Sequence, residues 1–326
     1  MKHIKTEVPE REDWKPKENE IIKVSHLTQD FGLGMGVFDV SFSIRKGEVY
    51  GFLGPNGAGK STTIRHIMGF YRPQSGRTYI NGLESFDNYS QILKNIGYLP
   101  GEPALPLSYT GTEFIDEMKR LKGVKDETML NHLISYFECD PNIPCKAMSL
   151  GMKRKIAIVV AFMSDPDVLV LDEPTSGLDP LMQEKFISFI KEEKTRNKTI
   201  LLSSHIFQEV DATCDRIGII KDGKIVSEVL ADNLKHASLK TYKIVFADQC
   251  SFDSMTRTDF HGQLKYVSAD NDQRALTLSV EDKDIHVLID ALSNYQIADF
   301  VQIKETLQDY FLSFYKENQD FSGVRK

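Results

Sequence analysis

This sequence of 326 residues has little cysteine, a single tryptophan and no excess of positive charge. Its four cysteines form no Cys-x-x-Cys pair and no metal-ligand spacing, which indicates free thiols in a reducing compartment rather than disulfides or a zinc site. The net charge of −7 disfavours nucleic-acid binding, for which a basic domain is typical. We therefore expect no nucleic-acid partner.

Long hydrophobic runs are also lacking. The longest apolar stretch, Ile156 to Met163, is far shorter than the roughly 18–20 residues that a membrane-spanning helix needs. The segment from Met1 to Glu7 has no apolar core of the kind found in a signal peptide. We expect a cytoplasmic protein that reaches a membrane only through another chain or by surface contact. Residues 1–19 are charged, carry Trp14 and are expected to form a flexible extension.

One glycine-rich segment is the most informative part of the chain. It has the form Gly-x-x-x-x-Gly-Lys-Ser, follows an expected strand over residues 48–53 and precedes an expected helix. Such glycines let backbone N–H groups converge on phosphate oxygens, and the helix dipole adds positive potential. Lys60 is expected to reach the β- and γ-phosphates, and the Ser61 hydroxyl to ligate Mg²⁺. The predicted phosphate-binding residues are Gly54, Pro55, Asn56, Gly57, Ala58, Gly59, Lys60, Ser61 and Thr62.

Two adjacent carboxylates, Asp172 and Glu173, follow an apolar strand about 110 residues after this phosphate loop. The carboxyl edge of a parallel sheet is where ligands bind in such folds. Asp172 is expected to hold Mg²⁺ through water, and Glu173 to polarise the attacking water as a general base. His205 ends the next expected strand at the same edge, and we predict that it is functional rather than structural.

The order of the expected elements indicates an α/β fold. Near-continuous apolar strands over 168–171 and 199–203 flank a helix over 182–193, which together form a βαβ unit of a parallel sheet. Further strands are expected over 21–25 and 40–44, and helices over 112–121 and 128–137.

The turn Asp222-Gly223 precedes a second region with its own pattern. Its strands are expected at 241–246, 264–267, 275–280 and 301–303, and its helices at 284–292 and 306–315. This pattern predicts a small α+β module. The expected domains are an extension over 1–19, a nucleotide-binding domain over 20–235 and a C-terminal accessory module over 236–326.

These residues, in this order, resemble the ATP-binding cassette (ABC) family over about residues 20–230. The resemblance implies ATP and Mg²⁺ as ligands. It also implies a phosphate-loop fold with a mixed, mainly parallel core sheet, an antiparallel β subdomain and a helical subdomain at about 102–165. By the same resemblance, His205 contacts the γ-phosphate and Phe31 stacks on adenine, for which it has the π-face. Ser176 and Asp179, in the turn after Glu173, are expected at a dimer contact.

The segment Ser149-Leu150-Gly151-Met152-Lys153 stands where the family has its signature motif, and we call it the signature segment. In the family this serine and glycine bind the γ-phosphate held by the opposite subunit. A serine and a glycine at a helix N-terminus suit an anion. The match is partial, because Leu150 and Met152 replace the usual glycine and glutamine.

One departure from the family pattern concerns the strand Ile96 to Pro100. The family normally follows it with a glutamine that touches Mg²⁺ or water and faces the membrane partner. Here the position is Gly101, followed by Glu102. Glu102 is a candidate to take over part of that role, since a carboxylate oxygen suits Mg²⁺. The alternative is that Glu102 is a solvated loop charge.

The resemblance implies the ATPase subunit of a membrane transporter. Two such domains would dimerise head to tail, as a homodimer or a heterodimer, and their closure on ATP would drive a separate transmembrane permease. The protein would then be peripheral on the inner face of the cell membrane. Residues 295–311 resemble the tail of subunits that export drugs, antimicrobial peptides or lipids. A generic amphipathic helix that covers the module's sheet is the alternative for this tail.

Two other classes of function fit less well. A soluble ABC-family ATPase that acts on ribosomes or DNA would generally carry two cassettes or a long coiled coil. This chain has one phosphate loop and only about 90 residues between Ser61 and Ser149, with no sustained heptads. A kinase or GTPase would leave the signature segment and His205 without a role.

Overall fold

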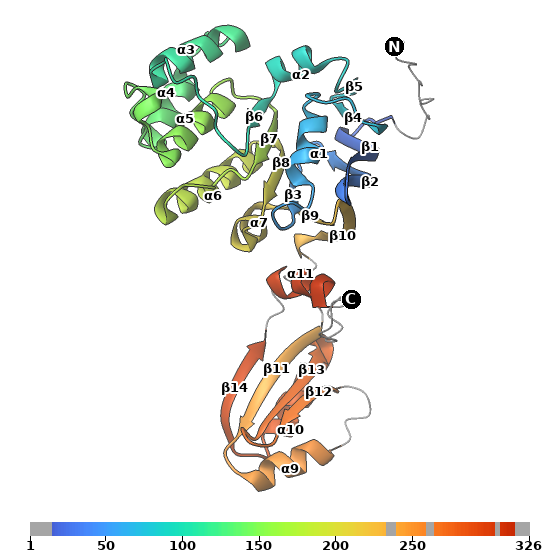
Figure 1. Ribbon diagram of the computed structural model, residues 1–326. Helices are drawn as coiled ribbons and strands as arrows, with labels where there is room; N and C mark the ends of the chain where they lie inside the picture. Colours follow the sequence, from blue (N-terminus) through green and yellow to red (C-terminus); the bar gives the residue numbers. More distant parts are fainter. Residues whose placement is uncertain (1–14, 233–238, 259–263, 304–306, 317–326) are drawn as a thin grey trace. The chain divides into compact units, whose positions relative to one another are not determined.

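The computed structural model describes residues 15–232, 239–258, 264–303 and 307–316 (Figure 1). Trp14 and most of the expected N-terminal extension lie outside these residues. The chain divides into two compact units, Met1–Ala231 and Asp232–Lys326, which are described separately below. Throughout the described part of the chain, no helix combines the length and the apolar character needed to cross a bilayer.

A six-stranded sheet forms the centre of the first unit, in the order β10-β9-β3-β8-β7-β6. All neighbours from β9 to β6 are parallel, and β10 joins the β9 edge antiparallel. The sheet is therefore mixed and mainly parallel, as the fold class predicted from the sequence required. Its strands are β3 (Val49–Leu53), β6 (Gly97–Leu99), β7 (Val168–Asp172), β8 (Thr199–Ser204), β9 (Arg216–Lys221) and β10 (Lys224–Leu230).

An antiparallel sheet of four strands, in the order β2-β1-β4-β5, forms the expected β subdomain. Two of its strands are much longer than the alternating patterns predicted. Register shifts in the β1–β2 pairing, such as the one between Val24 and Leu27, interrupt the alternation of buried and exposed residues. A search for strict alternation therefore finds only part of each strand. The strands are β1 (Glu20–Gly32), β2 (Met35–Arg45), β4 (Ser75–Ile80) and β5 (Leu83–Glu84).

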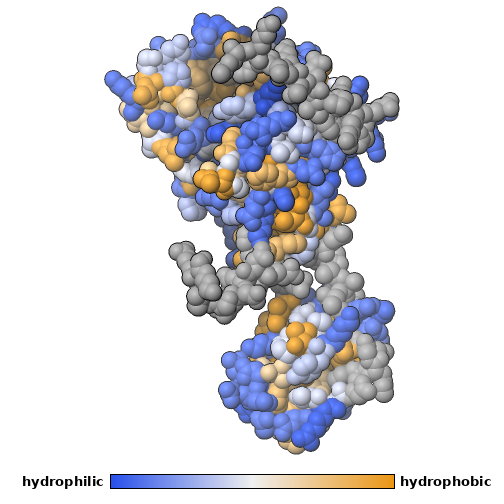
Figure 2. Space-filling view, turned by 45° about the vertical axis from the view of Figure 1, so that its right-hand side comes forward, coloured by the Kyte–Doolittle hydropathy of each residue, from blue (hydrophilic) through white to orange (hydrophobic). Residues whose placement is uncertain are grey.

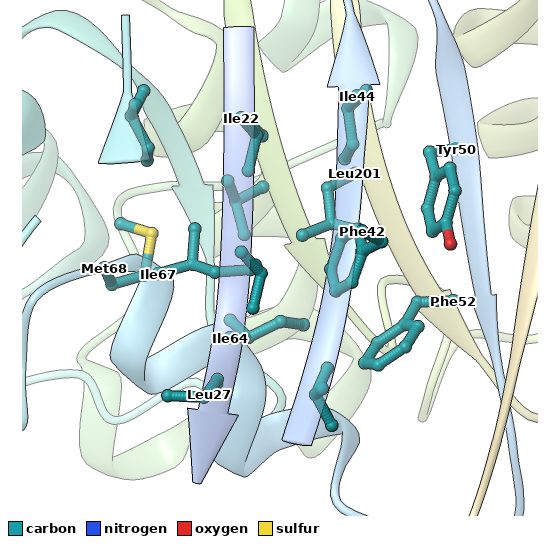
Figure 3. Packing of buried hydrophobic residues seen from close by; sticks show 14 of the residues in the cluster. Ile22, Leu27, Phe42, Ile44, Tyr50, Phe52, Ile64, Ile67, Met68 and Leu201 are labelled. Atoms are coloured by element: carbon teal, nitrogen blue, oxygen red, sulfur yellow. The ribbon is translucent and has the colours of Figure 1, made fainter. Parts of the chain in front are cut away.

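Helix α1 (Lys60–Ile67) connects the two sheets through their shared core (Figure 3). Ile64 and Ile67 of α1 lie in one buried cluster with Ile22 of β1 and Leu201 of β8. Its start is thus held rigidly beneath the phosphate loop, because tightly packed interiors resist displacement.

The remaining helices of the first unit include the expected helical subdomain. Helix α3 begins with a capping box between Thr110 and Glu113 and ends at Gly123, whose φ is +69°. Helix α6 begins after Asp179, whose carboxylate caps it, with Pro180 in the first turn. The helices are α2 (Tyr89–Asn95), α3 (Gly111–Lys122), α4 (Thr128–Tyr136), the short 3₁₀ helix η2 (Cys145–Ala147), α5 (Leu150–Phe162), α6 (Pro180–Thr195) and α7 (Phe207–Thr213).

The second unit has its own core and a β-α-β-β-α-β order. Its sheet is antiparallel throughout in the order β12-β13-β11-β14, which is the strand order of a ferredoxin-like split βαβ fold. Helices α9 and α10 cover the same face of this sheet, since both contribute to one buried cluster with the strands. Its elements are β11 (Leu239–Phe246), α9 (Gln249–Arg257), β12 (Leu264–Asp270), β13 (Ala275–Glu281), η3 (Asp282–Asp284), α10 (Ile285–Leu292), β14 (Ile297–Ile303) and α11 (Leu307–Lys316).

The surface seen in Figure 2 alternates in character, with hydrophobic residues in patches separated by hydrophilic ones. Apolar atoms contribute a large share of the surface of any folded protein, so hydrophobic residues among hydrophilic ones are expected here.

Candidate functional site

The strand register brings the predicted site residues to one edge of the six-stranded sheet. Leu53, the last residue of β3, pairs with Ser204, and Asp172, the last residue of β7, pairs with Ser203. The phosphate loop, the carboxylate pair and the segment before His205 therefore all leave the sheet at its carboxyl edge, where parallel sheets bind ligands.

The phosphate loop runs directly from β3 into α1. Gly57 and Gly59 have φ values of +82° and +111°, which favour glycine. A Cβ at Gly59 would also meet Val37 Cγ1 at 2.7 Å, so a side chain is excluded there for two reasons. Gly59 is the N-cap residue of α1, and the first N–H groups of a helix have no partner within it. These donors give the loop the character of an anion site.

The Lys60 side chain is buried inside this loop. Its ammonium donates to the carbonyl oxygens of Gly54 at 2.6 Å and Pro55 at 3.1 Å. It also lies 3.0 Å from Glu173 Oε1, as an ion pair without hydrogen-bond geometry. The positive charge is therefore held by two carbonyl oxygens of the phosphate loop, next to the Glu173 carboxylate.

Asp172 is buried and is held by the neighbouring strand. Ser203 Oγ donates to Asp172 Oδ1 at 2.5 Å, which is short enough for a strong bond to a carboxylate. Gly101 approaches from the other side, and a Cβ there would lie 3.0 Å from Asp172 Oδ2. The orientation of this carboxylate is thus fixed by β8 and by the loop after β6.

Glu173 has a left-handed backbone, with φ of +47°, which is uncommon for a residue other than glycine. Its N–H donates to the Ser203 carbonyl at 3.0 Å, which holds the chain in this conformation. His205 Nδ1 lies 2.6 Å from Glu173 Oε2. Because a carboxylate accepts, Nδ1 carries the proton, and Nε2 is the nitrogen left to contact a ligand.

Glu209 lies behind His205 and was not predicted from the sequence. It is buried, and its Oε2 accepts from Ser204 Oγ at 2.6 Å, while Ser204 Oγ accepts from the Ile206 N–H at 2.9 Å. Burial, followed by the negative charge of Glu173, raises the pKa of Glu209 to about 7. These bonds fix both sides of the turn that carries His205.

The signature segment starts helix α5. Ser149 is the N-cap residue, and its Oγ accepts from the Met152 N–H at 3.2 Å. Gly151 packs against the turn after Glu173, since a Cβ there would meet the Gly177 carbonyl at 2.9 Å. Within the described residues, neither Ser149 nor Gly151 forms a hydrogen bond with the phosphate loop. Among the described residues, the signature segment and the phosphate loop are therefore not linked by a hydrogen bond.

Phe31 is the second-to-last residue of β1 and is exposed. It lines a hollow of about 410 Å³ that also borders the first turns of α1, next to the phosphate loop. An aromatic face at this position suits a base. The residues that line the hollow are Gln29, Phe31, Thr62, Arg65, His66, Tyr71 and Arg72.

The oxygen atoms available near the sheet edge fit Mg²⁺ rather than a fully protein-bound metal. The described residues contain no cluster of three or more His, Cys, Asp or Glu side chains arranged to hold an ion. Mg²⁺ is usually bound through one or two carboxylates together with waters and substrate phosphates. Ser61 and Asp172 supply oxygen donors of that kind, and Glu102 lies exposed in the loop after Gly101.

Comparisons with known proteins agree with the fold and identify the family. Residues 37–176 match the family model described as ABC transporter. The bacitracin transport ATP-binding protein BcrA of Bacillus licheniformis is 34% identical over 232 residues, which cover 70% of this chain and 76% of that protein. The lantibiotic transport ATP-binding protein SrtF of Streptococcus pyogenes is 34% identical over 210 residues, which cover 64% of this chain and 90% of that protein.

Solved structures give the same result for the fold. The structure of an ATP-binding subunit of an ABC transporter aligns with a TM-score of 0.61 and 31% identity, covering 67% of this chain and 92% of that chain. A dimeric ATP-binding cassette in a post-hydrolysis state, bound to ADP and Pi, aligns with a TM-score of 0.59 over 64% of this chain and 98% of that chain. At 23% identity, the second likeness concerns the fold alone.

Proposed function

The chain belongs to the ABC transporter family, and on that premise we propose that it powers export as the ATP-binding and ATP-hydrolysing subunit of a membrane transporter. Because the chain belongs to this family, it binds and hydrolyses ATP. The observation that best supports the catalytic proposal is the chain of contacts Lys60–Glu173–His205 at the carboxyl edge of the sheet.

Each residue of this site has a proposed task. Residues Gly54 to Thr62 wrap the phosphates with backbone N–H groups, and Lys60 neutralises the β- and γ-phosphates. Glu173 accepts a proton from the attacking water as general base, and His205 Nε2 contacts the γ-phosphate. Phe31 stacks on the adenine at the hollow beside α1.

Ser61 and Asp172 would hold Mg²⁺, which supplies charge neutralisation at the β- and γ-phosphates when bound. Glu102 is a hypothesis for a further ligand, supported by its place directly after Gly101, whose backbone adjoins Asp172. Glu102→Gln and Glu102→Ala test it. If both variants keep the ATPase rate and its Mg²⁺ dependence, Glu102 has no role at the metal.

A complete site needs two chains. We propose that Ser149 and Gly151 of one subunit contact the γ-phosphate held at Lys60 of another, with Ser176 and Asp179 at the contact between them. This arrangement gives Ser149 and Gly151 a ligand, which they do not reach within their own chain. ATP would then favour the closed dimer, because it binds both halves only in that state.

The proposed partner is a separate transmembrane permease, which would place this subunit on the inner face of the cell membrane. The relatives named for bacitracin and lantibiotic transport favour a drug, antimicrobial peptide or lipid as cargo. Copurification from solubilised membranes tests this proposal. A hydrophobic permease should be recovered with the chain, whereas recovery with ribosomes or DNA would support a soluble ATPase of the same family and contradict transport.

A further inference from the structure

Among the described residues of the first unit, Arg154 is the most deeply buried arginine, with 1% of its surface exposed. It stands on the second turn of α5, shortly after Ser149 and Gly151. Its three nitrogens each donate to a backbone carbonyl: Nε to Ser176 at 3.1 Å, Nη1 to Pro100 at 2.7 Å, and Nη2 to Gly101. One side chain thus ties α5 to two separate loops.

These two loops flank the carboxylate pair at the end of β7. Pro100 and Gly101 follow β6, which pairs with β7, and the Gly101 backbone adjoins the Asp172 carboxylate. Ser176 belongs to the turn after Glu173, and its N–H donates to the Glu173 carbonyl at 3.1 Å. Gly101 therefore connects Arg154 to Asp172, and Ser176 connects it to Glu173. A movement of either carboxylate residue would be transmitted to Arg154 through one of these two residues.

The charge of Arg154 also belongs to this site. Within the described residues, no carboxylate forms an ion pair with it. Burial lowers the pKa of Arg154, and the nearby negative charges of Asp172, Glu173 and Glu209 partly oppose that shift. Its guanidinium N–H groups instead donate to the three backbone carbonyl oxygens named above. A guanidinium suits this task because it presents several N–H groups in a rigid plane and stays charged.

The start of α5 is attached to the same turn by a second contact. Gly151 lies so close to the Gly177 carbonyl that a Cβ would be 2.9 Å away, and Leu150 occupies the space next to Gly177. The start of α5 and the turn at 176–177 are thus packed directly against each other. Through its hydrogen bonds to Pro100 and Gly101, Arg154 also attaches the loop after β6 to the start of α5.

We propose that Arg154 is a positioning residue that couples the chain's own ATP site to the signature segment it offers to a second subunit. The inference rests on the proposed dimer function. Arg154 links the backbones beside Asp172 and Glu173 to the helix that begins with Ser149 and Gly151. It also gives Gly101, which has no side chain, a firm connection to the helical subdomain through its carbonyl.

The test uses the full-length chain with Arg154→Met, which keeps much of the length but removes every donor, and Arg154→Lys, which keeps the charge and some of the bonds. The matched control is Arg216→Lys. Arg216 also bonds a carbonyl, that of Ser43, together with Glu48 and Glu228. Circular dichroism first establishes that each variant is folded.

In a Glu173→Gln background, the monomer's affinity for a fluorescent ATP analogue and its ATP-dependent dimerisation are measured separately. We expect Arg154→Met to change the analogue's Kd by less than about threefold and to weaken dimerisation about tenfold or more, since hydrogen bonds from a charged group are lost. With Glu173 intact, kcat should fall by a similar factor while KM stays nearly constant. Arg154→Lys should be intermediate, and Arg216→Lys should match the parent.

The possible failures are distinguishable. If the Glu173→Gln parent itself does not dimerise with ATP, the proposed dimer function is wrong. If the parent dimerises and the folded Arg154 variants dimerise equally well with normal kcat, the coupling role of Arg154 is wrong. A loss of analogue binding that equals the loss of dimerisation would also overturn it, because Arg154 would then act on the ATP site alone.

Discussion

The Lys60 ammonium lies 3.0 Å from one carboxylate oxygen of Glu173, and the other oxygen lies 2.6 Å from His205 Nδ1. A single carboxylate therefore joins the cation of the phosphate loop to the histidine of the next strand. A γ-phosphate bound at Lys60, as proposed, would compete with Glu173 for the ammonium. Nucleotide binding should consequently release one Glu173 oxygen, which is then free to accept a proton from water.

Glu173→Gln should bind ATP and dimerise but hydrolyse it about 10²–10⁴-fold more slowly, because the amide cannot act as general base. The amide keeps the size of the side chain and can still accept a bond from His205. ATPase turnover and nucleotide retention after gel filtration measure the two effects. Glu184→Gln, an exposed glutamate on α6, is the control. Normal turnover in the Glu173 variant would remove this residue as the base.

Lys60→Met should weaken ATP binding about tenfold to a hundredfold, since it removes the buried charge that is proposed to contact phosphate. The protein should still fold, because the methionine side chain can occupy most of the buried volume that the Lys60 side chain fills inside the loop. Equilibrium binding of a fluorescent ATP analogue gives the loss directly. An unchanged Kd would mean that the phosphates bind elsewhere.

Glu209 predicts a pH dependence of stability. Its pKa in the folded protein, about 7, is above the ordinary value of 4.5, so between these values the folded state binds more protons than the unfolded state. Wild-type stability should therefore fall as pH rises from 4.5 to 7, and the loss should be complete above 7. Relative to wild type, Glu209→Gln should gain up to about 3 kcal/mol over that range.

Urea unfolding at pH 5 and pH 8 measures this difference for the wild type and for Glu209→Gln. Glu184→Gln serves again as the exposed control, and its difference from wild type should stay constant. Parallel pH profiles for the wild type and the Glu209 variant would show that the carboxyl group titrates normally.

Phe31→Ala should raise the KM for ATP about 5- to 150-fold, because stacking of a base on an aromatic ring is worth about 1–3 kcal/mol. Phe31→Tyr keeps the ring and should leave KM close to the wild-type value. Steady-state ATPase assays compare the three proteins. If alanine and tyrosine behave alike, adenine does not stack on this residue.

The placement of the candidate site residues at one edge of the sheet could be predicted from the sequence because these residues follow strands. The phosphate loop follows one strand, and the two carboxylates follow another. Because the carboxyl ends of parallel strands lie at the same edge of a sheet, the order of these segments along the chain is enough to predict where they lie. The fold class was predicted for the same reason, and the structural relatives confirm it. The roles predicted for Ser149 and Gly151 rest on the family resemblance, since a serine that starts a helix is common.

Other features had no local signal. Arg154 is one basic residue in a segment with Lys153 and Lys155, and nothing in the spacing indicates that it alone is buried among carbonyls. Glu209 looks like an ordinary polar position of a short helix. The helix α9 was not predicted because only Phe252 and Met255 among its nine residues are buried, which is too weak a pattern for its length. Strands β9 and β10 were also missed, although both complete the sheet.

The close approach of Gly101 to Asp172 has a consequence for substitutions at this position. A side chain there would place its Cβ 3.0 Å from Asp172 Oδ2, which is tighter than most Cβ contacts, so the carboxylate would have to shift by a few tenths of an ångström. Because Ser203 Oγ donates to the other oxygen of this carboxylate, the shift would also reach β8. A glutamine introduced at position 101 would therefore add its own side chain and move Asp172 at the same time, and the two effects would not be additive.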